Sequence, residues 1–167
     1  TVQGTWSVNP DGSVRFVPAD DFGGTAGVDY QIADANGSTA GARLVVTIGQ
    51  PPHTVAQAAD VTAQNVTVEL DPLANDVAGD DGSGALGSLE ATSLELTGAG
   101  ASADGRTLVR DGVGTWTVNL DGTISFDPEP GFTGDASVSY RVADSFGNTA
   151  EGTADVTVTP ITPTAVA

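Results

Sequence analysis

Hydrophobic and polar side chains alternate with a period of two along most of this chain, which is the pattern of strands with one buried face. In residues 137–142, for example, Val, Tyr and Val alternate with Ser, Ser and Arg. No segment carries apolar residues at the spacing of a helical stripe, so we expect an all-β fold. The alternating runs predict strands at residues 66–70, 93–96, 107–110, 115–119, 123–126, 137–142 and 154–158.

Short glycine-containing sequences separate the alternating runs. Asp-Gly pairs at residues 11–12 and 121–122 each join two such runs, and glycine closes the turns 34–37 and 144–147. Glycine readily adopts the positive φ that a tight β-hairpin requires. About seven short strands joined by such turns predict an antiparallel β-sandwich. We expect its core to contain Trp116, Phe126, Tyr140 and Val142.

Trp116 has two candidate roles. A tryptophan ring on a sheet can form a platform on which a sugar stacks, or it can pack in the core. The strict alternation of residues 115–119 puts Trp116 on the same face as Val118. Because large aromatic side chains are highly buried on average, this pattern favours the core.

The chain contains an internal repeat. Residues 1–48 align without a gap onto residues 111–158, and 21 of the 48 positions are identical. Such an alignment indicates duplication. A repeat of about 110 residues has the size of a domain, whereas solenoid units have roughly 20–50 residues. The matched positions include the aromatic pairs Trp6 and Trp116, Phe16 and Phe126, Phe22 and Phe132, and Tyr30 and Tyr140.

The phase of the repeat predicts the domain organisation. Residues 1–50 correspond to the C-terminal half of one repeat, and residues 51–160 to a complete repeat. Residues 163–167 resemble residues 52–56 at the start of the complete repeat, so we expect residues 161–167 to be a linker and the beginning of a third repeat. Strands without partners expose apolar faces and edges. Residues 1–48 therefore predict completion either by a preceding segment or by strand exchange with another chain.

Composition and charge exclude several functions. The chain has 22 acidic and 5 basic side chains, all five of them arginine, and a net charge of -17. This charge repels phosphate backbones and anionic lipid, and no apolar run reaches the roughly 20 residues of a membrane span, so we expect no nucleic acid partner and no membrane insertion. Without cysteine or lysine, neither a disulfide nor a Lys–Asn isopeptide bond can form. The single histidine, His53, lies beside two prolines, so a Ser-His-Asp triad would have to be built on a linker.

One acidic loop, residues 71–81, has the composition of a calcium site. Calcium takes about six to eight oxygen ligands, mostly from carboxylates and carbonyls. The loop lacks the D-x-[DN]-x-[DN]-G spacing of an EF-hand. The alternative is a cluster of Asx turns, in which Asp and Asn side chains accept hydrogen bonds from nearby backbone N–H groups. No cofactor is required by this sequence, but calcium is a candidate, with the ligands Asp71, Asn75, Asp76, Asp80 and Asp81.

Two carboxylate pairs are candidates for catalysis. They are Asp20 with Asp21, and Asp127 with Glu129. Paired carboxylates can hydrolyse glycosides at defined separations. These pairs differ between the two copies, since Asp20 aligns with Pro130. A catalytic pair is expected in a cleft rather than on a turn that varies between repeats, so we expect no enzyme.

Residues 52–160 resemble the CshA-type fibril repeat of bacterial surface adhesins. The pattern runs from Asp-Pro-Leu-Ala-Asn-Asp at residues 71–76 through Gly-Thr-Trp at residues 114–116, and continues to residue 158. Residues 1–48 match its second half. Ig-like and cadherin-like tandem repeats of large adhesins are looser relatives. The chain departs from commoner members in a stretch rich in Gly, Ala and Ser at residues 82–105, where we expect a loop-rich excursion.

The resemblance implies tandem Ig-like antiparallel β-sandwich repeats in a secreted, cell-wall-attached fibrillar protein. Such repeats form a stalk that spaces a binding tip from the cell wall, and they carry no catalytic residues. Their partners would be neighbouring repeats of the same chain, while other domains bind a host or bacterial surface ligand. The alternative is a carbohydrate- or protein-binding adhesion module, calcium-dependent if the acidic loop holds the ion. Phe146, aligned with Asn36, is the one aromatic candidate for such a binding face.

Overall fold

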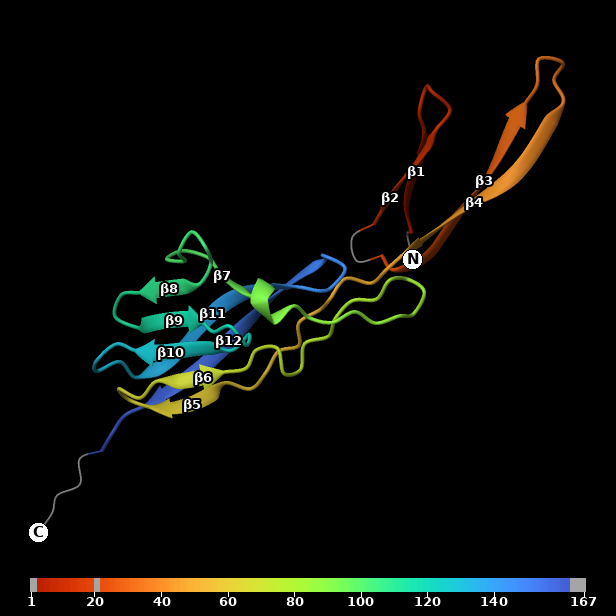
Figure 1. Cartoon of the computed structure of the whole chain (residues 1–167). Coiled ribbons are helices and arrows are strands. Elements are labelled where there is room, and N and C mark those ends of the chain that lie inside the picture. The colour runs from red at the N-terminus through yellow and green to blue at the C-terminus, as the bar shows by residue number, and fades with distance from the viewer. Residues whose placement is uncertain (1–2, 20–21, 163–167) are drawn as a thin grey trace, which may run out of the picture.

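The computed structural model of this chain describes residues 3–19 and 22–162, and its regular elements are almost all strands (Figure 1). Two β-hairpins come first, and eight strands that form a sandwich follow. Within the described ranges, no helix is long and apolar enough to cross a membrane. The first four strands are β1 (Gly4–Val8), β2 (Val14–Pro18), β3 (Gly24–Ala33) and β4 (Thr39–Ile48). The sandwich comprises β5 (Asp60–Ala63), β6 (Val68–Leu70), the 3-10 turn η1 (Ala91–Ser93), β7 (Glu95–Thr97), β8 (Thr107–Arg110), β9 (Gly114–Val118), β10 (Ile124–Pro128), β11 (Gly134–Ala143) and β12 (Thr149–Thr159).

Two four-stranded sheets form the sandwich. One has the strand order β6-β10-β9-β8, and the other has the order β5-β12-β11-β7. The all-β sandwich expected from the alternating pattern is confirmed. One detail was wrong, since β5 runs parallel to β12 while the other neighbours are antiparallel.

The sequence pattern missed β5 because its buried residue is polar. Thr62 is 8% exposed, whereas Val61 is 67% exposed, which inverts the usual assignment of apolar residues to the inner face. The Thr62 hydroxyl donates to the Val66 carbonyl oxygen at 2.9 Å, which satisfies a polar group that burial would otherwise penalise.

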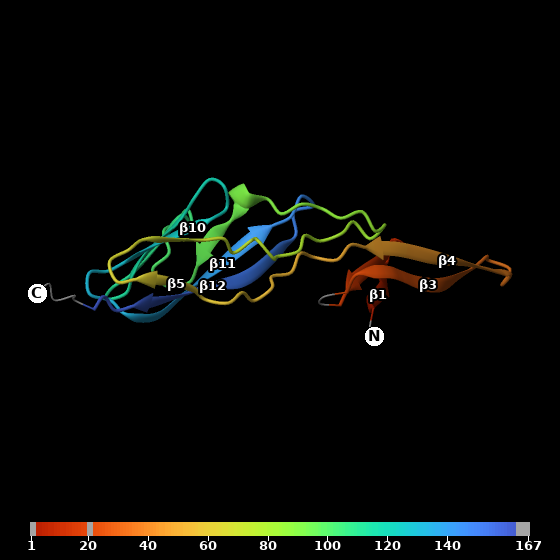
Figure 2. The ribbon, with the colours of Figure 1, turned by 90° about the horizontal axis from the view of Figure 1, so that it is seen from below.

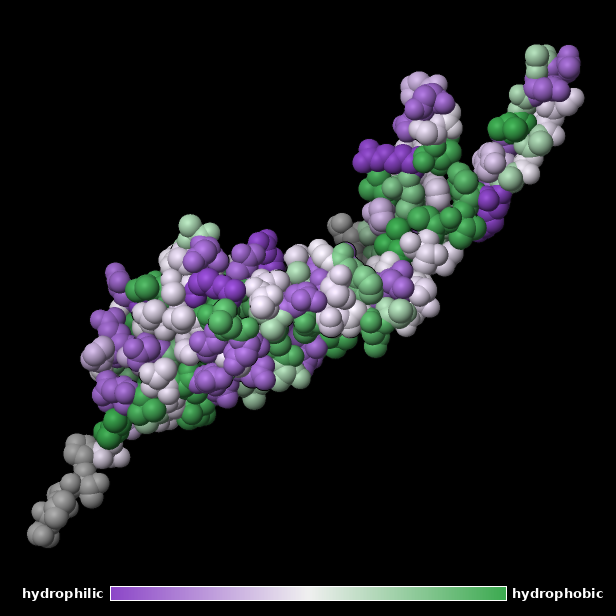
Figure 3. Space-filling model, in the orientation of Figure 1, coloured by the Kyte–Doolittle hydropathy of each residue, from purple (hydrophilic) through white to green (hydrophobic). Residues whose placement is uncertain are grey.

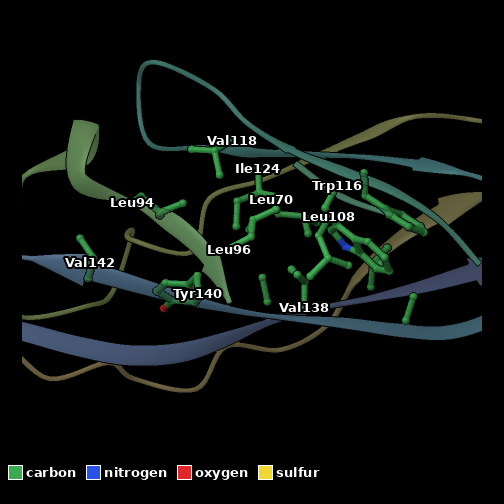
Figure 4. Close-up of a cluster of buried hydrophobic side chains, with 14 of the residues drawn as sticks. Leu70, Leu94, Leu96, Leu108, Trp116, Val118, Ile124, Val138, Tyr140 and Val142 are labelled. Atoms are coloured by element: carbon green, nitrogen blue, oxygen red, sulfur yellow. The ribbon is translucent and has the colours of Figure 1, made fainter. Parts of the chain in front are cut away.

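The core lies between the two sheets and contains the four side chains expected there (Figure 4). Trp116 and Phe126 are fully buried, and Tyr140 and Val142 are each 1% exposed. The Trp116 and Phe126 rings lie face to face at a tilt, with their centroids 4.6 Å apart. The buried position of Trp116 confirms packing over the sugar-platform role.

The two halves of this repeat contribute differently to the core. Strands β9 to β12 supply eleven of the buried apolar side chains, and the half before them supplies four leucines. Neither half forms the core alone, because each sheet takes its two central strands from β9 to β12 and its two outer strands from the half before them. The leucines are Leu70, Leu94, Leu96 and Leu108, and the other eleven residues are Trp116, Val118, Ile124, Phe126, Ala136, Val138, Tyr140, Val142, Ala154, Val156 and Val158.

The first two hairpins repeat the geometry of the last two. Trp6 pairs with Phe16 in the β1–β2 hairpin, as Trp116 pairs with Phe126 in the β9–β10 hairpin. The Trp6 and Phe16 rings are 4.5 Å apart, which is nearly the separation of the later pair. The ten residue pairs of β3 and β4 likewise keep the register of β11 and β12. Within the described ranges, however, each early hairpin is a sheet of only two strands.

The structure leaves the domain boundaries as predictions. The division into residues 1–50, 51–160 and 161–167 rests on the sequence repeat. Most of the last segment, residues 163–167, lies outside the described residues. What the structure adds is the arrangement of the parts, since the β3–β4 hairpin and the sandwich follow one another along an elongated molecule (Figure 2).

The Asp-Gly turns have the predicted conformation. Gly12 has a φ of 84° and Gly122 a φ of 91°, in the left-handed region that glycine tolerates. In the second turn, Asp121 accepts hydrogen bonds from the hydroxyl and the backbone N–H of Thr123 at 2.8 and 3.1 Å. These bonds favour the ionised carboxylate, and they hold the pKa of Asp121 below its usual value.

The two tryptophans give a matched test of the core. Trp116→Ala should lower the free energy of unfolding of the sandwich by about 3–5 kcal/mol, because it removes a fully buried ring and leaves a cavity. Trp6→Ala should change it by less than about 0.5 kcal/mol, because Trp6 lies outside the sandwich core. Urea unfolding followed by circular dichroism measures both, and equal losses would contradict the assignment of Trp116 to the core.

Candidate functional site

The acidic loop at residues 71–81 uses its carboxylates to hold backbone in place. Asp76 accepts hydrogen bonds from the Val55 N–H at 2.8 Å and from the Tyr140 hydroxyl at 2.6 Å. Asp81 accepts from the hydroxyl and N–H of Ser83 and from the Ala85 N–H. The Ser83 bonds hold the pKa of Asp81 below its usual value. Asp81 therefore acts as the Asx-turn alternative predicts, whereas Asp76 joins segments that are distant in sequence.

The other calcium candidates occupy different positions. Asp80 accepts from the Gly82 N–H at 2.6 Å, whereas the Asp71 side chain is exposed and only its backbone carbonyl accepts a hydrogen bond from Gln57. Asn75 is exposed. In the described part of the chain, no three His, Cys, Asp or Glu side chains come together as a metal-ligand group. Calcium binding at Asp71, Asn75, Asp76, Asp80 and Asp81 stays a prediction.

Tyr140 ties the sandwich to this loop. Its ring lies in the core, and its hydroxyl donates to Asp76 and lies 3.3 Å from the Pro72 carbonyl oxygen. A Cβ on Gly152, in the neighbouring strand β12, would lie 2.6 Å from the Tyr140 hydroxyl, so glycine makes room for the ring. Burial raises the pKa of Tyr140 well above its usual value, and the Asp76 carboxylate raises it further.

Residues 77–87 hold the linker that follows β4. We call these residues the clasp loop; its first five residues are also the last five of the acidic loop. The Asp80 N–H donates to the Gln50 carbonyl oxygen at 3.0 Å, and the Gln50 N–H donates to Asp80 Oδ1 at 3.3 Å. His53 and Val77 exchange two backbone hydrogen bonds of 2.9 and 3.0 Å. His53 thus serves the linker through its backbone, and four hydrogen bonds fix the first hairpins to the sandwich.

Glycine allows the clasp loop to approach the linker closely. A Cβ on Gly49 would lie 1.9 Å from the Asp80 carbonyl oxygen, and a Cβ on Gly79 would lie 2.1 Å from the Gln50 carbonyl oxygen. Neither distance leaves room for a methyl group. The contact between linker and clasp loop therefore requires glycine at both positions.

The stretch at residues 82–105 is only partly the excursion expected from its composition. Its first part belongs to the clasp loop, whose Asp80 forms an isolated bridge with Leu86. The rest forms η1 and β7 and places Leu94 and Leu96 in the core. The alternation at residues 93–96 predicted this strand, although the stretch around it is rich in Gly, Ala and Ser.

Asp144 is a buried carboxylate that the sequence pattern did not single out. It is 2% exposed, and its Oδ1 accepts from the N–H groups of Phe146 and Asn148 at 2.9 Å. Asp34, its counterpart in the first copy, makes the same two turn bonds but is exposed. The difference arises because Gly79 of the clasp loop lies over Asp144, with its Cβ position 2.5 Å from Oδ2. The matching turn sequences account for the hydrogen bonds that Asp34 and Asp144 share, whereas the burial of Asp144 depends on its contact with the clasp loop.

The candidate binding and catalytic residues in the described part of the chain contact neighbouring loops. Phe146 is 47% exposed, and the edge of its ring lies against Gly87 of the clasp loop. Asp127 accepts from the Thr67 hydroxyl at 3.0 Å, and Glu129 accepts from the Gly112 N–H. These two carboxylates therefore fasten neighbouring loops. The other pair, Asp20 with Asp21, lies outside the described residues.

The clasp loop contact can be tested at Gly49. Gly49→Ala should separate the loop from the linker, because the added methyl group meets the Asp80 carbonyl oxygen. Hydrogen exchange of the Gln50 and Asp80 amides should become about 10-fold faster, while the β9 to β12 amides keep their rates. Gly41→Ala is the matched control, since its Cβ would lie at an ordinary 3.4 Å from the nearest atom, the Tyr30 carbonyl oxygen. Unchanged Asp80 exchange in the Gly49 variant would show that the contact does not hold the linker.

The Tyr140 hydroxyl predicts a loss of stability in alkali. The unfolded chain releases the phenolic proton near pH 10, whereas the folded protein resists this, so the free energy of unfolding should fall as the pH rises above about 10. Tyr140→Phe should cost about 1 kcal/mol at pH 7 through the lost bond to Asp76, and should flatten the alkaline fall. Tyr30→Phe, at an exposed ring, should preserve it. Urea titrations at pH 7 to 11 measure this, and a fall that persists in Tyr140→Phe would assign it to other groups.

Comparison with known proteins agrees with this architecture. The sequence model of a family described as a bacterial Ig domain matches residues 1–47 and 49–159. A search of curated proteins found no match. Bacterial Ig domains commonly occur in surface proteins, and they are typically non-enzymatic structural modules. With its sandwich and its early hairpins both inside the matched segments, this chain belongs to the bacterial Ig domain family.

Proposed function

We propose that this chain is part of the stalk of a secreted, cell-wall-attached fibrillar adhesin of bacteria, of the CshA type. Its repeats act as structural spacers that hold a binding tip away from the cell wall, and they carry out no catalysis. The observation that carries the proposal is the joint at residues 49–53, where the chain passes from one copy into the next under the clasp loop. A module that acts alone has no need of such a joint.

The geometry of the joint supports a stiff connection. Four hydrogen bonds link Gln50 and His53 to the clasp loop, and Pro51 and Pro52 lie between these two residues. Proline fixes φ and favours extended backbone, so the linker has few alternative conformations. The β3–β4 hairpin continues the long direction of the sandwich beyond this point (Figure 2).

The chemistry of the chain suits a stalk without covalent reinforcement. The sequence has no cysteine and no lysine, so its resistance to force comes from strand pairing, packing and joints such as this one. The net charge of -17 makes neighbouring repeats repel one another, which opposes collapse and lateral clumping, less so at high salt.

Small-angle X-ray scattering tests the stalk. Four copies of residues 49–158 joined end to end keep the joint, because Val158 aligns with Ile48. If each repeat adds about 40 Å, as strands of ten or more residues and their turns suggest, the rod of about 160 Å has a radius of gyration near 46 Å, against about 22 Å for a compact chain of the same length. The same four copies with Gly49→Ala in each should bend at the joints and scatter as a shorter particle. A radius near the compact value in the unmodified repeats would refute the proposal.

A further inference from the structure

The first two hairpins carry an apolar face that the described part of the chain covers only in part. Val8 is 74% exposed, Ile32 is 63% exposed and Tyr30 is 40% exposed. Ala26 is the only buried apolar residue of the described part of these hairpins. In the space-filling view, apolar side chains gather on both hairpin arms where the arms come together (Figure 3). Exposed apolar surface on this scale marks an interaction site.

The internal repeat identifies this face as the inside of a sandwich. The eleven buried positions of β9 to β12 correspond to eleven positions of β1 to β4, and all eleven are apolar in both copies. Outward-facing positions do not all keep their character, since Val17 aligns with Asp127 and Val45 with Asp155. The early hairpins thus keep the apolar positions of a sandwich core, although in the described ranges each is a sheet of only two strands.

The outer strand edges of the early hairpins lead to the same interpretation as their apolar face. In the sandwich, β9 and β10 lie between β8 and β6, and β11 and β12 lie between β7 and β5. The corresponding outer edges of β1 to β4 have no strand beside them in the described ranges. Each early hairpin therefore offers two free backbone edges, and these are the edges that the first half of the later repeat fills.

We propose that β1 to β4 form an acceptor surface for an N-terminal half-repeat joined ahead of β1. By half-repeat we mean a segment with the four strands of residues 51–110, which adds one strand to each free edge and inserts four leucines between the hairpins. The model for this occupant is the chain itself, where Leu70, Leu94, Leu96 and Leu108 cover β9 to β12.

The connection favours a half-repeat in the same chain over a second copy of the hairpins. In the later repeat, only residues 111–113 separate β8 from β9, so the two halves are held together at high effective concentration. Two copies of the early hairpins packed face to face would cover the apolar face but would leave the four edges of each copy unfilled. A half-repeat would cover the apolar face and also pair with the free strand edges.

Extension of the chain tests the proposal. A copy of residues 51–110 placed directly before Thr1 reproduces the connection of the later repeat, because Thr1 aligns with Asp111. In this extended chain, hydrogen exchange at residues 4–18 and 24–48 should slow by about 100-fold or more relative to the original chain. Mass spectrometry resolves these peptides from residues 114–128 and 134–158, because the sequences of the two copies differ.

A matched control distinguishes covering of the hairpin face from the effect of a longer chain. The same extension with Leu96→Asp and Leu108→Asp in the added copy alone should leave the early hairpins as unprotected as in the original chain. Unchanged hairpin exchange in the unmodified extension, with the β5 to β12 sandwich still protected, would overturn the proposal. Hairpins already protected in the original chain, together with dimers in light scattering, would overturn it as well, because a second copy would then cover the face.

Discussion

The fold depends on one constraint: the core closes only when both halves of the repeat are present, because each half supplies two strands to each sheet. Eleven buried side chains from β9 to β12 meet four leucines from the half before them, and backbone pairing at all four outer edges joins the halves. Where both halves are present, the rings of Trp116 and Phe126 are sealed. Where one half stands alone, the same ring pair forms at nearly the same distance, but it stays partly open to water. Hairpin geometry is therefore local, while burial belongs to the whole repeat.

Carboxylates stabilise the connections around this core. Asp76 links the loop after β6 to the Tyr140 hydroxyl, Asp80 holds the linker, and Asp144 closes a turn beneath the clasp loop. In each case the carboxylate accepts hydrogen bonds from a hydroxyl or from backbone N–H groups, and such bonds allow an acidic side chain to lie near an interior. Much of the acidity of the chain thus has a structural use, beyond the repulsion that its net charge creates.

Sequence patterns predicted most of the fold but little of the site. Alternation located β6 to β12 and the core ring pair because each of these strands has one clearly apolar face. It missed β5, where Thr62 is buried and Val61 is exposed. It also indicated no role for Gly49 of the linker or for Gly79 of the clasp loop. Gly49 and Gly79 matter because two backbones meet there, and the segments that meet are some 30 residues apart in sequence. The burial of Asp144 follows from the same long-range contact, so no local pattern could have indicated it.

The parallel pairing of β5 with β12 determines how a load would act on the sandwich. These are its first and last strands, and residues 60–63 lie in parallel register with residues 156–159. A pull applied to the two ends of the sandwich draws β5 and β12 in opposite directions along their common axis. The hydrogen bonds between them are then strained together in shear, rather than opened one after another as in a peeled antiparallel hairpin. Strand β5, which the sequence pattern missed, would therefore bear such a load in shear together with β12.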